Sequence, residues 1–185
     1  MFKYQFINHP ESFVLDDSRI ARVFELVSRV PPVSVIARLE PAPPENGEAI
    51  QVSKRGTTGS FVPQDDGHGQ NAGNTQNGIL NIAFLSDEEI RVLNRDHRGI
   101  DKTTDVLSFH YYDDFSDLGS DDIAGEVILS ESRILAQALE HQHSPQKETE
   151  ILVLHSILHI IGYDHEEDEE YEEMWKWEGE LRGKL

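Results

Sequence analysis

The sequence of 185 residues contains no cysteine and is poor in apolar residues. Without cysteine, disulfide bonds and thiolate-bound zinc sites are excluded, and a reducing compartment is the expected home. The apolar share of 37% is low for a globular protein, which indicates that part of the chain is not packed. No stretch approaches the ~20 apolar residues of a membrane span, and the first residues lack a signal-peptide run. We therefore expect a soluble, cytoplasmic protein.

Positive charge is also scarce. The chain has 16 lysines and arginines against 35 acidic residues, a formal net charge of −19. This balance argues against non-specific binding to nucleic acid, because like charge repels the phosphate backbone. The charge is unevenly distributed, however. Acidic residues dominate Asp164–Glu180, whereas Arg91–Lys102 carries four basic residues and two acidic ones. Such a locally basic patch can still hold RNA through a modest, salt-sensitive contact.

Three of the nine histidines stand in the pattern H-x3-H-x2-G-x2-H, at His155, His159 and His165. Residues four apart project from the same face of an α-helix, so His155 and His159 can share one metal ion. Gly162 adopts a left-handed backbone without steric penalty and is expected to end the helix and turn His165 back towards the pair. Three imidazoles with one open coordination position are typical of a catalytic zinc site. The alternative, hydrogen-bonded core histidines, does not explain the spacing.

The histidine spacing also matches the extended signature of zinc proteases, with one departure. Proteases place a glutamate directly after the first histidine as general base, and Ser156 occupies that position here. A serine hydroxyl cannot do that work. The sequence therefore predicts a zinc-protease-like scaffold whose peptidase machinery is incomplete.

Hydrophobic periodicity predicts alternating strands and helices. Strands are expected at Phe2–Ile7, Val33–Leu39, Ile79–Leu85, Val106–Tyr111 and Ile123–Leu129. Helices are expected after Asp17 or Ser18, after Ser86 with Glu89 in a capping box, after Ser130 and after Ser144-Pro145. The polar stretch Asn94–Asp105 is predicted to be turn-like. This order implies an α+β fold, a small mixed β-sheet packed against helices.

Two helices of the C-terminal half have predicted buried faces. On the helix of the histidines, an apolar stripe of Ile151, Leu154, Leu158 and Ile161 is expected to face the sheet, with the histidines at its border. The last helix, Asp168–Leu185, is expected to bury Tyr171, Met174, Trp175 and Leu181. Its carboxylates are interpreted as helix-start and solvated residues rather than ligands.

Residues 41–78 differ in composition from the rest of the chain. They hold seven of the 13 glycines and four of the eight prolines, with few large apolar residues. Such a segment buries too little surface to offset its ordering entropy. We therefore predict one domain spanning residues 1–185, interrupted by a flexible insertion at about 40–78.

A family resemblance is carried by the segments HSILHIIGYDHEED, LNRDHRGIDKTTDVLSF and GEVILS. The chain resembles the YbeY family of bacterial rRNA maturation endoribonucleases over nearly all of Ile79–Leu185. The resemblance implies a zincin-like fold, one Zn²⁺ ion and single-strand-specific cleavage of RNA. It further implies processing of the 16S rRNA 3′ end, ribosome quality control, and RNA and ribosomal proteins as partners, with no role for DNA or membranes. Most relatives lack the segment Val33–Gly78.

The resemblance also assigns residues. The zinc ligands fall on His155, His159 and His165, and the family's functional arginine falls on Arg98. An arginine suits a phosphate, since its fork of donors fits the oxygens on which charge accumulates. Lys102 is a possible second phosphate contact. The general base stays open between the zinc-bound hydroxide, Asp164, Glu126 and the RNA 2′-hydroxyl, and Asp164 is also interpreted as a turn residue or an outer-shell acceptor.

Two further functions stay open from the sequence. One is a metal-dependent hydrolase of another bond, such as a peptidase, which Ser156 disfavours. The other is a non-catalytic ribosome-assembly factor in which zinc only braces the fold. The three histidines alone do not select zinc among divalent ions, because imidazole also suits nickel, copper and iron.

Overall fold

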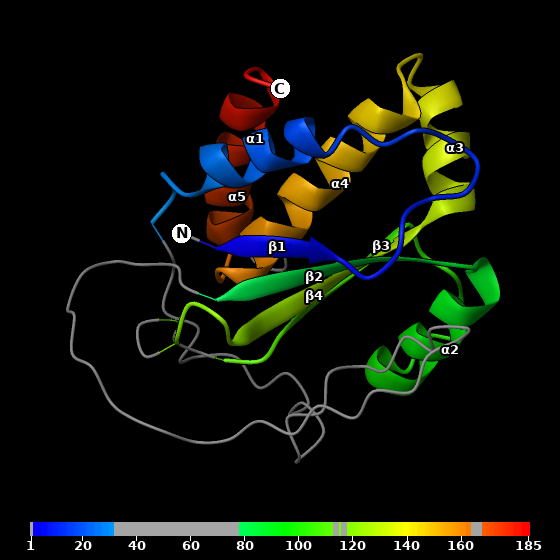
Figure 1. Cartoon of the computed structure of the whole chain (residues 1–185), viewed down its shortest axis with the longest axis horizontal. Helices are drawn as coiled ribbons and strands as arrows, with labels where there is room; N and C mark the ends of the chain where they lie inside the picture. Colours follow the sequence, from blue (N-terminus) through cyan, green and yellow to red (C-terminus); the bar gives the residue numbers. More distant parts are fainter. Residues whose placement is uncertain (1, 32–77, 113–114, 116–117, 164–167) are drawn as a thin grey trace.

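The computed structural model describes residues 2–31, 78–112, 115, 118–163 and 168–185 (Figure 1). The helices and strands run in the order β1 (Lys3–Phe6), α1 (Asp17–Val27), β2 (Ile79–Leu85), α2 (Asp87–Arg98), β3 (Val106–His110), β4 (Ile123–Ser130), α3 (Glu131–Glu140), α4 (Pro145–Ile160) and α5 (Asp168–Arg182). The predicted strand Val33–Leu39 and the predicted insertion lie outside the described residues, Gly78 excepted. Among the helices described, none has the length and apolar character needed to cross a membrane.

Within the described residues the strands form one four-stranded sheet in the order β1-β2-β4-β3. β1 pairs in parallel with β2 (Lys3 opposite Ile79), and β2 pairs in parallel with β4. β3 is antiparallel to β4, with Val106 opposite Leu129. The predicted α+β class with a small mixed sheet is therefore confirmed.

α2, α3 and α4 begin where the sequence predicts, whereas α1 is capped by Asp16 and not by the predicted Asp17 or Ser18. Asp16, Ser86, Ser130 and Ser144 cap α1, α2, α3 and α4, each accepting a hydrogen bond from a backbone N–H of the first turn. Ser86 and Glu89 form the predicted capping box. A side-chain acceptor at this position satisfies an N–H that has no partner inside the helix.

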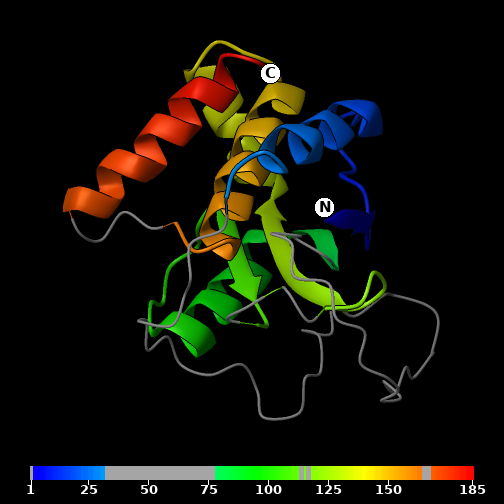
Figure 2. The same cartoon turned by 90° about the vertical axis from the view of Figure 1, so that its left-hand side faces the viewer.

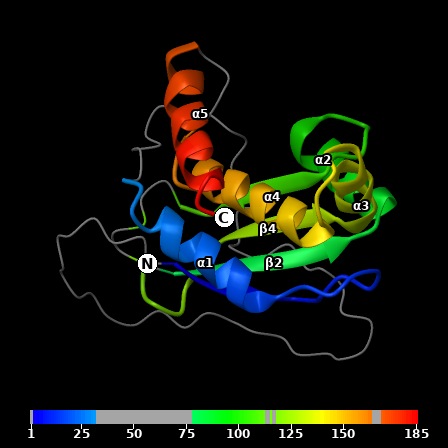
Figure 3. The ribbon, with the colours of Figure 1, turned by 90° about the horizontal axis from the view of Figure 1, so that it is seen from above.

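The main core lies between one face of the sheet and α1 and α4. Figure 1 shows both helices above the sheet, and Figure 3 shows α4 running across β4. Leu80, Ile82, Val127 and Leu129 point into this core from the strands. Side chains of α4 are buried almost all round, as expected for a helix enclosed by other elements.

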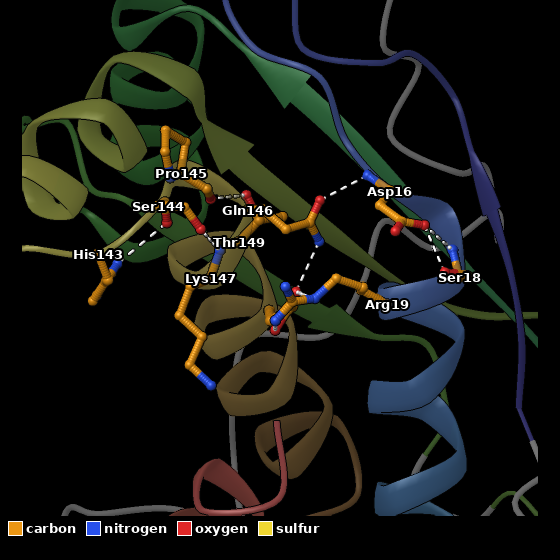
Figure 4. Close-up of polar contacts among 10 residues, drawn as sticks. Asp16, Ser18, Arg19, His143, Ser144, Pro145, Gln146, Lys147 and Thr149 are labelled. Atoms are coloured by element: carbon orange, nitrogen blue, oxygen red, sulfur yellow. Dashed lines mark hydrogen bonds and ion pairs between the residues drawn. The ribbon is translucent and has the colours of Figure 1, made fainter.

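The start of α4 is fixed to α1 by a polar network (Figure 4). The guanidinium of Arg19 contacts both carboxylate oxygens of Glu150, at 2.5 and 2.9 Å. Gln146 donates to Glu150 (2.9 Å) and accepts from the backbone N–H of Asp16 (2.7 Å). The Glu150 side chain is 1% exposed, so this bidentate pair satisfies a charge that would be costly to bury alone.

α2 lies on the opposite face of the sheet (Figure 1). Its Ile90 packs on Leu107 and Ile128 in a second, smaller core. α2 continues to Arg98, so the turn predicted from Asn94 is wrong for its first residues. The helix ends at Gly99, which has φ +70°, and the buried Asn94 amide donates to the Lys102 carbonyl at 2.8 Å.

Two burial predictions are corrected. Met174 and Leu181 of α5 are buried as predicted, but Trp175 is 66% exposed and Trp177 packs against the core instead. Ile151 is only half-buried, because it lies on the same face of α4 as His155 and His159 rather than on the stripe of Leu154 and Leu158. The Tyr171 side chain lies outside the described residues.

Candidate metal centre

His155 and His159 lie side by side on α4. Their Nε2 atoms are 3.0 Å apart and their ring centroids 4.5 Å apart, with the ring planes almost perpendicular at 84°. Both residues are half-buried, whereas Leu154, Ser156, Ile157 and Leu158 around them are buried. The helix therefore presents two imidazole nitrogens to one point at the border of the core, as the spacing predicted.

A carboxylate from α5 orients the first of these rings. Oε1 of Glu178 lies 2.5 Å from Nδ1 of His155, and the other oxygen lies 3.3 Å from Nη2 of Arg182. Figure 2 shows the C-terminal end of α5 reaching the layer of α4, which brings these residues together. Since an ionised carboxylate only accepts hydrogen bonds, Nδ1 of His155 is the donor and carries the proton.

The pKa of Glu178 fits this arrangement. Burial works to raise the pKa of this carboxyl, but the hydrogen bond from His155 and the charges of His155, Arg182 and His159 outweigh it and lower the pKa below its usual value. Glu178 is therefore ionised at neutral pH. In neutral His155, with the proton on Nδ1, the lone pair is on Nε2, the atom that faces His159.

The two histidines fit a divalent transition metal. Zinc binds imidazole nitrogen at about 2.0–2.1 Å, so two such nitrogens at a tetrahedral angle lie about 3.3–3.4 Å apart. The observed 3.0 Å is within a few tenths of an ångström of that separation. A carboxylate on the other ring nitrogen is the usual outer-shell partner of a metal-binding histidine.

The chain turns directly after α4. Gly162 has φ +99°, and the backbone N–H of Tyr163 donates to the carbonyl of Leu158. The predicted left-handed bend at Gly162 is therefore confirmed. His165 and Asp164, which follow it, lie outside the described residues, so the third predicted ligand stays a prediction.

Sequence reasoning missed Glu178 because it interpreted the acidic residues of α5 as solvated. A signal was present: Met174, Glu178 and Leu181 are four and three residues apart, which puts the carboxylate on the buried face of the helix. An acidic residue on an apolar face needs a partner, and here the partner is His155.

The residue after the first histidine is unsuited to proton transfer. Ser156 is fully buried, and its hydroxyl oxygen has no hydrogen-bond partner among the described residues. Glu126 is also unsuited. Its neighbour Val127 points towards α4, so Glu126 points to the α2 face of the sheet, where Asn81 donates to it at 3.1 Å. Glu126 is therefore removed from the candidates for a base at the histidine pair.

Arg98 is exposed at the last turn of α2. Its side chain makes no hydrogen bond or ion pair with the described part of the chain, whereas the guanidiniums of Arg91 and Arg95 lie close to Asp101 and Asp96. Arg98 thus leaves its five donors available to a ligand.

A cavity of about 250 Å³ extends along α4 from His155. Its walls include Asp105 and Val106 at the start of β3, Gln137 and His141 around α3, and Arg182 of α5. Glu148, two turns before His155 on α4, lies at its other end. The candidate metal centre is therefore open on one side to a partly polar space.

Residues 66–185 match the family described as Endoribonuclease YbeY. The chain is similar to Endoribonuclease YbeY of Clostridioides difficile (strain 630), with 39% identity over 61% of this chain and 75% of the relative. It is also similar to Endoribonuclease YbeY of Clostridium perfringens (strain SM101), with 42% identity over 57% of this chain and 73% of the relative.

Among solved structures, the solution structure of a Thermotoga maritima protein is similar to this chain. The sequence identity is 33%, the match covers 58% of this chain and 71% of that chain, and the TM-score is 0.37. The family match covers well over half of the sequence, including α4 with its two histidines and α5 with Glu178. The chain therefore belongs to the Endoribonuclease YbeY family.

Proposed function

We propose that this protein is a metal-dependent endoribonuclease that acts in rRNA processing. The observation that carries the proposal is the convergence of Nε2 of His155 and His159, with Glu178 on the far side of the His155 ring. The proposal is supported by the family match and by relatives that are named as endoribonucleases. We further propose cleavage of single-stranded RNA, maturation of the 16S rRNA 3′ end and association with ribosomal proteins, as the resemblance implies.

The proposed metal is one zinc ion, held by His155, His159 and His165. Glu178 keeps the proton of His155 on Nδ1 and so leaves Nε2 to the ion. When bound, such an ion lowers the pKa of water towards neutrality and withdraws charge from phosphoryl oxygens. The remaining tasks, which are to bind and orient the RNA, fall to side chains of the protein.

Arg98 is the proposed phosphate ligand. It is the exposed arginine of α2 that no described carboxylate neutralises, and it lies within the locally basic segment Arg91–Lys102. A guanidinium can bind two phosphate oxygens at once, and it does so more strongly as they gain charge. Lys102 is the proposed second contact.

A peptidase is disfavoured by Ser156, since the position of the expected general base holds a buried hydroxyl. We also propose that residues 1–185 form one domain around an insertion at about 40–78. The pairing of β1 with β2 across residues 7–78 supports this view.

The test is cleavage of a fluorescent single-stranded RNA by the purified protein, with a duplex of the same sequence and a peptide as alternative substrates. We expect single-strand cleavage that a chelator abolishes and zinc restores, and that His155→Ala removes. Cleavage unaffected by chelator, or of the peptide alone, contradicts the proposal. A folded, zinc-loaded protein without any turnover would instead support a non-catalytic assembly factor.

A further inference from the structure

A second group of potential metal ligands lies at the other end of α4. It consists of His141 and His143, in the turn after α3, and Glu148 in the first turn of α4. One ligand atom from each residue lies within 4.8 Å of the others. This group shares no residue with the candidate metal centre. None of its three residues belongs to a motif that the sequence analysis identified.

Glu148 is the residue that requires explanation. Its side chain is 4% exposed, and its Oε2 accepts no hydrogen bond from the described residues. The same oxygen lies 2.8 Å from Nε2 of His143 and 3.6 Å from Nδ1 of His141. A buried carboxylate oxygen that receives no hydrogen bond from neutral imidazole rings needs a positive charge beside it to offset its burial.

The orientation of His143 makes this contact more costly for a neutral ring. Its Nδ1 lies 3.2 Å from the carbonyl oxygen of Ser144 (Figure 4), and a carbonyl only accepts, so Nδ1 carries the proton. In the neutral ring the lone pair of Nε2 then faces Glu148. Two lone pairs at 2.8 Å repel each other unless positive charge lies between them, either a proton on His143 or a metal ion.

We propose that His141, His143 and Glu148 bind a second divalent transition-metal ion. Two imidazoles and a carboxylate are a zinc-type donor set, and the three ligands leave one position open to the cavity that Glu148 and His141 line. His141 is the ligand that must move to complete the set, and its 55% exposed side chain is free to do so. The ion ties the α3–α4 turn to the start of α4.

This second site is separate from the candidate metal centre. Glu148 and His155 are seven residues apart on one helix, a rise of about 10 Å. Paired metals that act on one phosphate lie only about 3.5–4 Å apart. The second ion is therefore not half of a two-metal centre, and its presence does not depend on the proposed RNA cleavage.

The test is equilibrium dialysis against buffered zinc, with bound metal measured by mass spectrometry. We expect two equivalents in the full chain. In His141→Ala, zinc affinity at the second site should fall by about 100-fold or more, because loss of an outer-shell partner alone costs 10–100-fold. Glu148→Gln should have the same effect. Both variants should still bind one equivalent of zinc at the candidate metal centre, and His155→Ala should remove that equivalent.

His9→Ala is the matched control, since His9 is exposed to a similar extent, 52% against 55%. It should keep both equivalents. Nitrogen chemical shifts of the His143 ring should move as the second equivalent is added. One equivalent in the full chain, or a second equivalent that survives in both His141→Ala and Glu148→Gln, overturns the proposal. In that case a proton on His143 alone would compensate the negative charge of the Glu148 carboxylate.

Discussion

Nδ1 of His155 and Oε1 of Glu178 are 2.5 Å apart, although the two residues are separated by 23 positions and lie on different helices. The contact fixes one ring of the candidate metal centre from the side away from His159. It also couples the packing of α5, through Met174 and Leu181, to the position of a candidate metal ligand. The C-terminal helix is therefore part of the site rather than an acidic appendage.

Replacing Glu178 should weaken metal binding. We expect Glu178→Ala to reduce zinc affinity at the histidine pair by about 10–100-fold, because the ring loses its orienting acceptor. Glu178→Gln, which keeps an acceptor but loses the charge, should fall between this variant and the wild type. Competition with a chromogenic chelator measures the affinity. Glu180→Gln, on the same helix but bonded to Lys184, is the control, and an equal effect there would contradict the role of Glu178.

Arg98→Ala should separate chemistry from folding. We expect RNA cleavage to fall by about 100-fold or more, as it does when one donor to a developing oxyanion is removed. Zinc content and melting temperature should not change, because Arg98 is exposed and has no partner among the described residues. Arg95→Ala removes the same charge from the same helix and should retain most activity. If both variants lose activity equally, general attraction to RNA explains the effect.

Gly162→Ala should destabilise the protein by about 1–2 kcal/mol, since an L side chain is strained at φ +99°. Zinc affinity should fall as well if His165 depends on the bend. Gly179→Ala is the matched control. A methyl group at Gly179, inside α5, would meet nothing within 4 Å, and we expect a gain of about 0.4–1 kcal/mol. Urea unfolding measures both changes, and equal stability of Gly162→Ala and wild type would be a failure of the prediction.

Glu126 should make stability depend on pH. Burial raises the pKa of this carboxyl above its usual 4.5, against smaller lowering effects of Asn81 and Tyr111. A raised pKa in the folded state means that stability is greatest below the unfolded pKa and is lost as pH rises through the folded one. Glu126→Gln should therefore be more stable than wild type at neutral pH and similar to it near pH 4. Urea unfolding at several pH values tests this, and the exposed Glu140→Gln should show no such trend.

Local sequence patterns predicted much of this fold for clear physical reasons. Ile79–Leu85 is an apolar run interrupted only by Asn81, and the strand has those bounds. Serines before apolar periods marked the starts of three helices, because each satisfies a backbone donor. The pair His155 and His159 followed from helix geometry alone.

The misses arose where long-range contacts decide. The last turn of α2 is polar because it is exposed, so its helical conformation left no apolar pattern. Trp175 and Trp177 are both possible core residues by composition, and only the orientation of α5 selects Trp177. Glu178 contacts His155, and Glu148 contacts His143, across separate elements of the fold. Residue spacing within a single helix cannot predict such contacts.

The parallel pairing of β1 with β2 has a consequence for biosynthesis. Lys3 pairs with Ile79, which is synthesised much later than Lys3. The delay between the synthesis of Arg19 and that of its partner Glu150 is longer still. At a translation rate of about 5–20 residues per second, the first strand stays without its neighbour for roughly 4–15 s. During that interval the nascent chain exposes Tyr4, Phe6 and the apolar side of α1. Shielding by a chaperone or by the ribosome surface is thus most valuable for the first thirty residues, before residues 79–185 have been made.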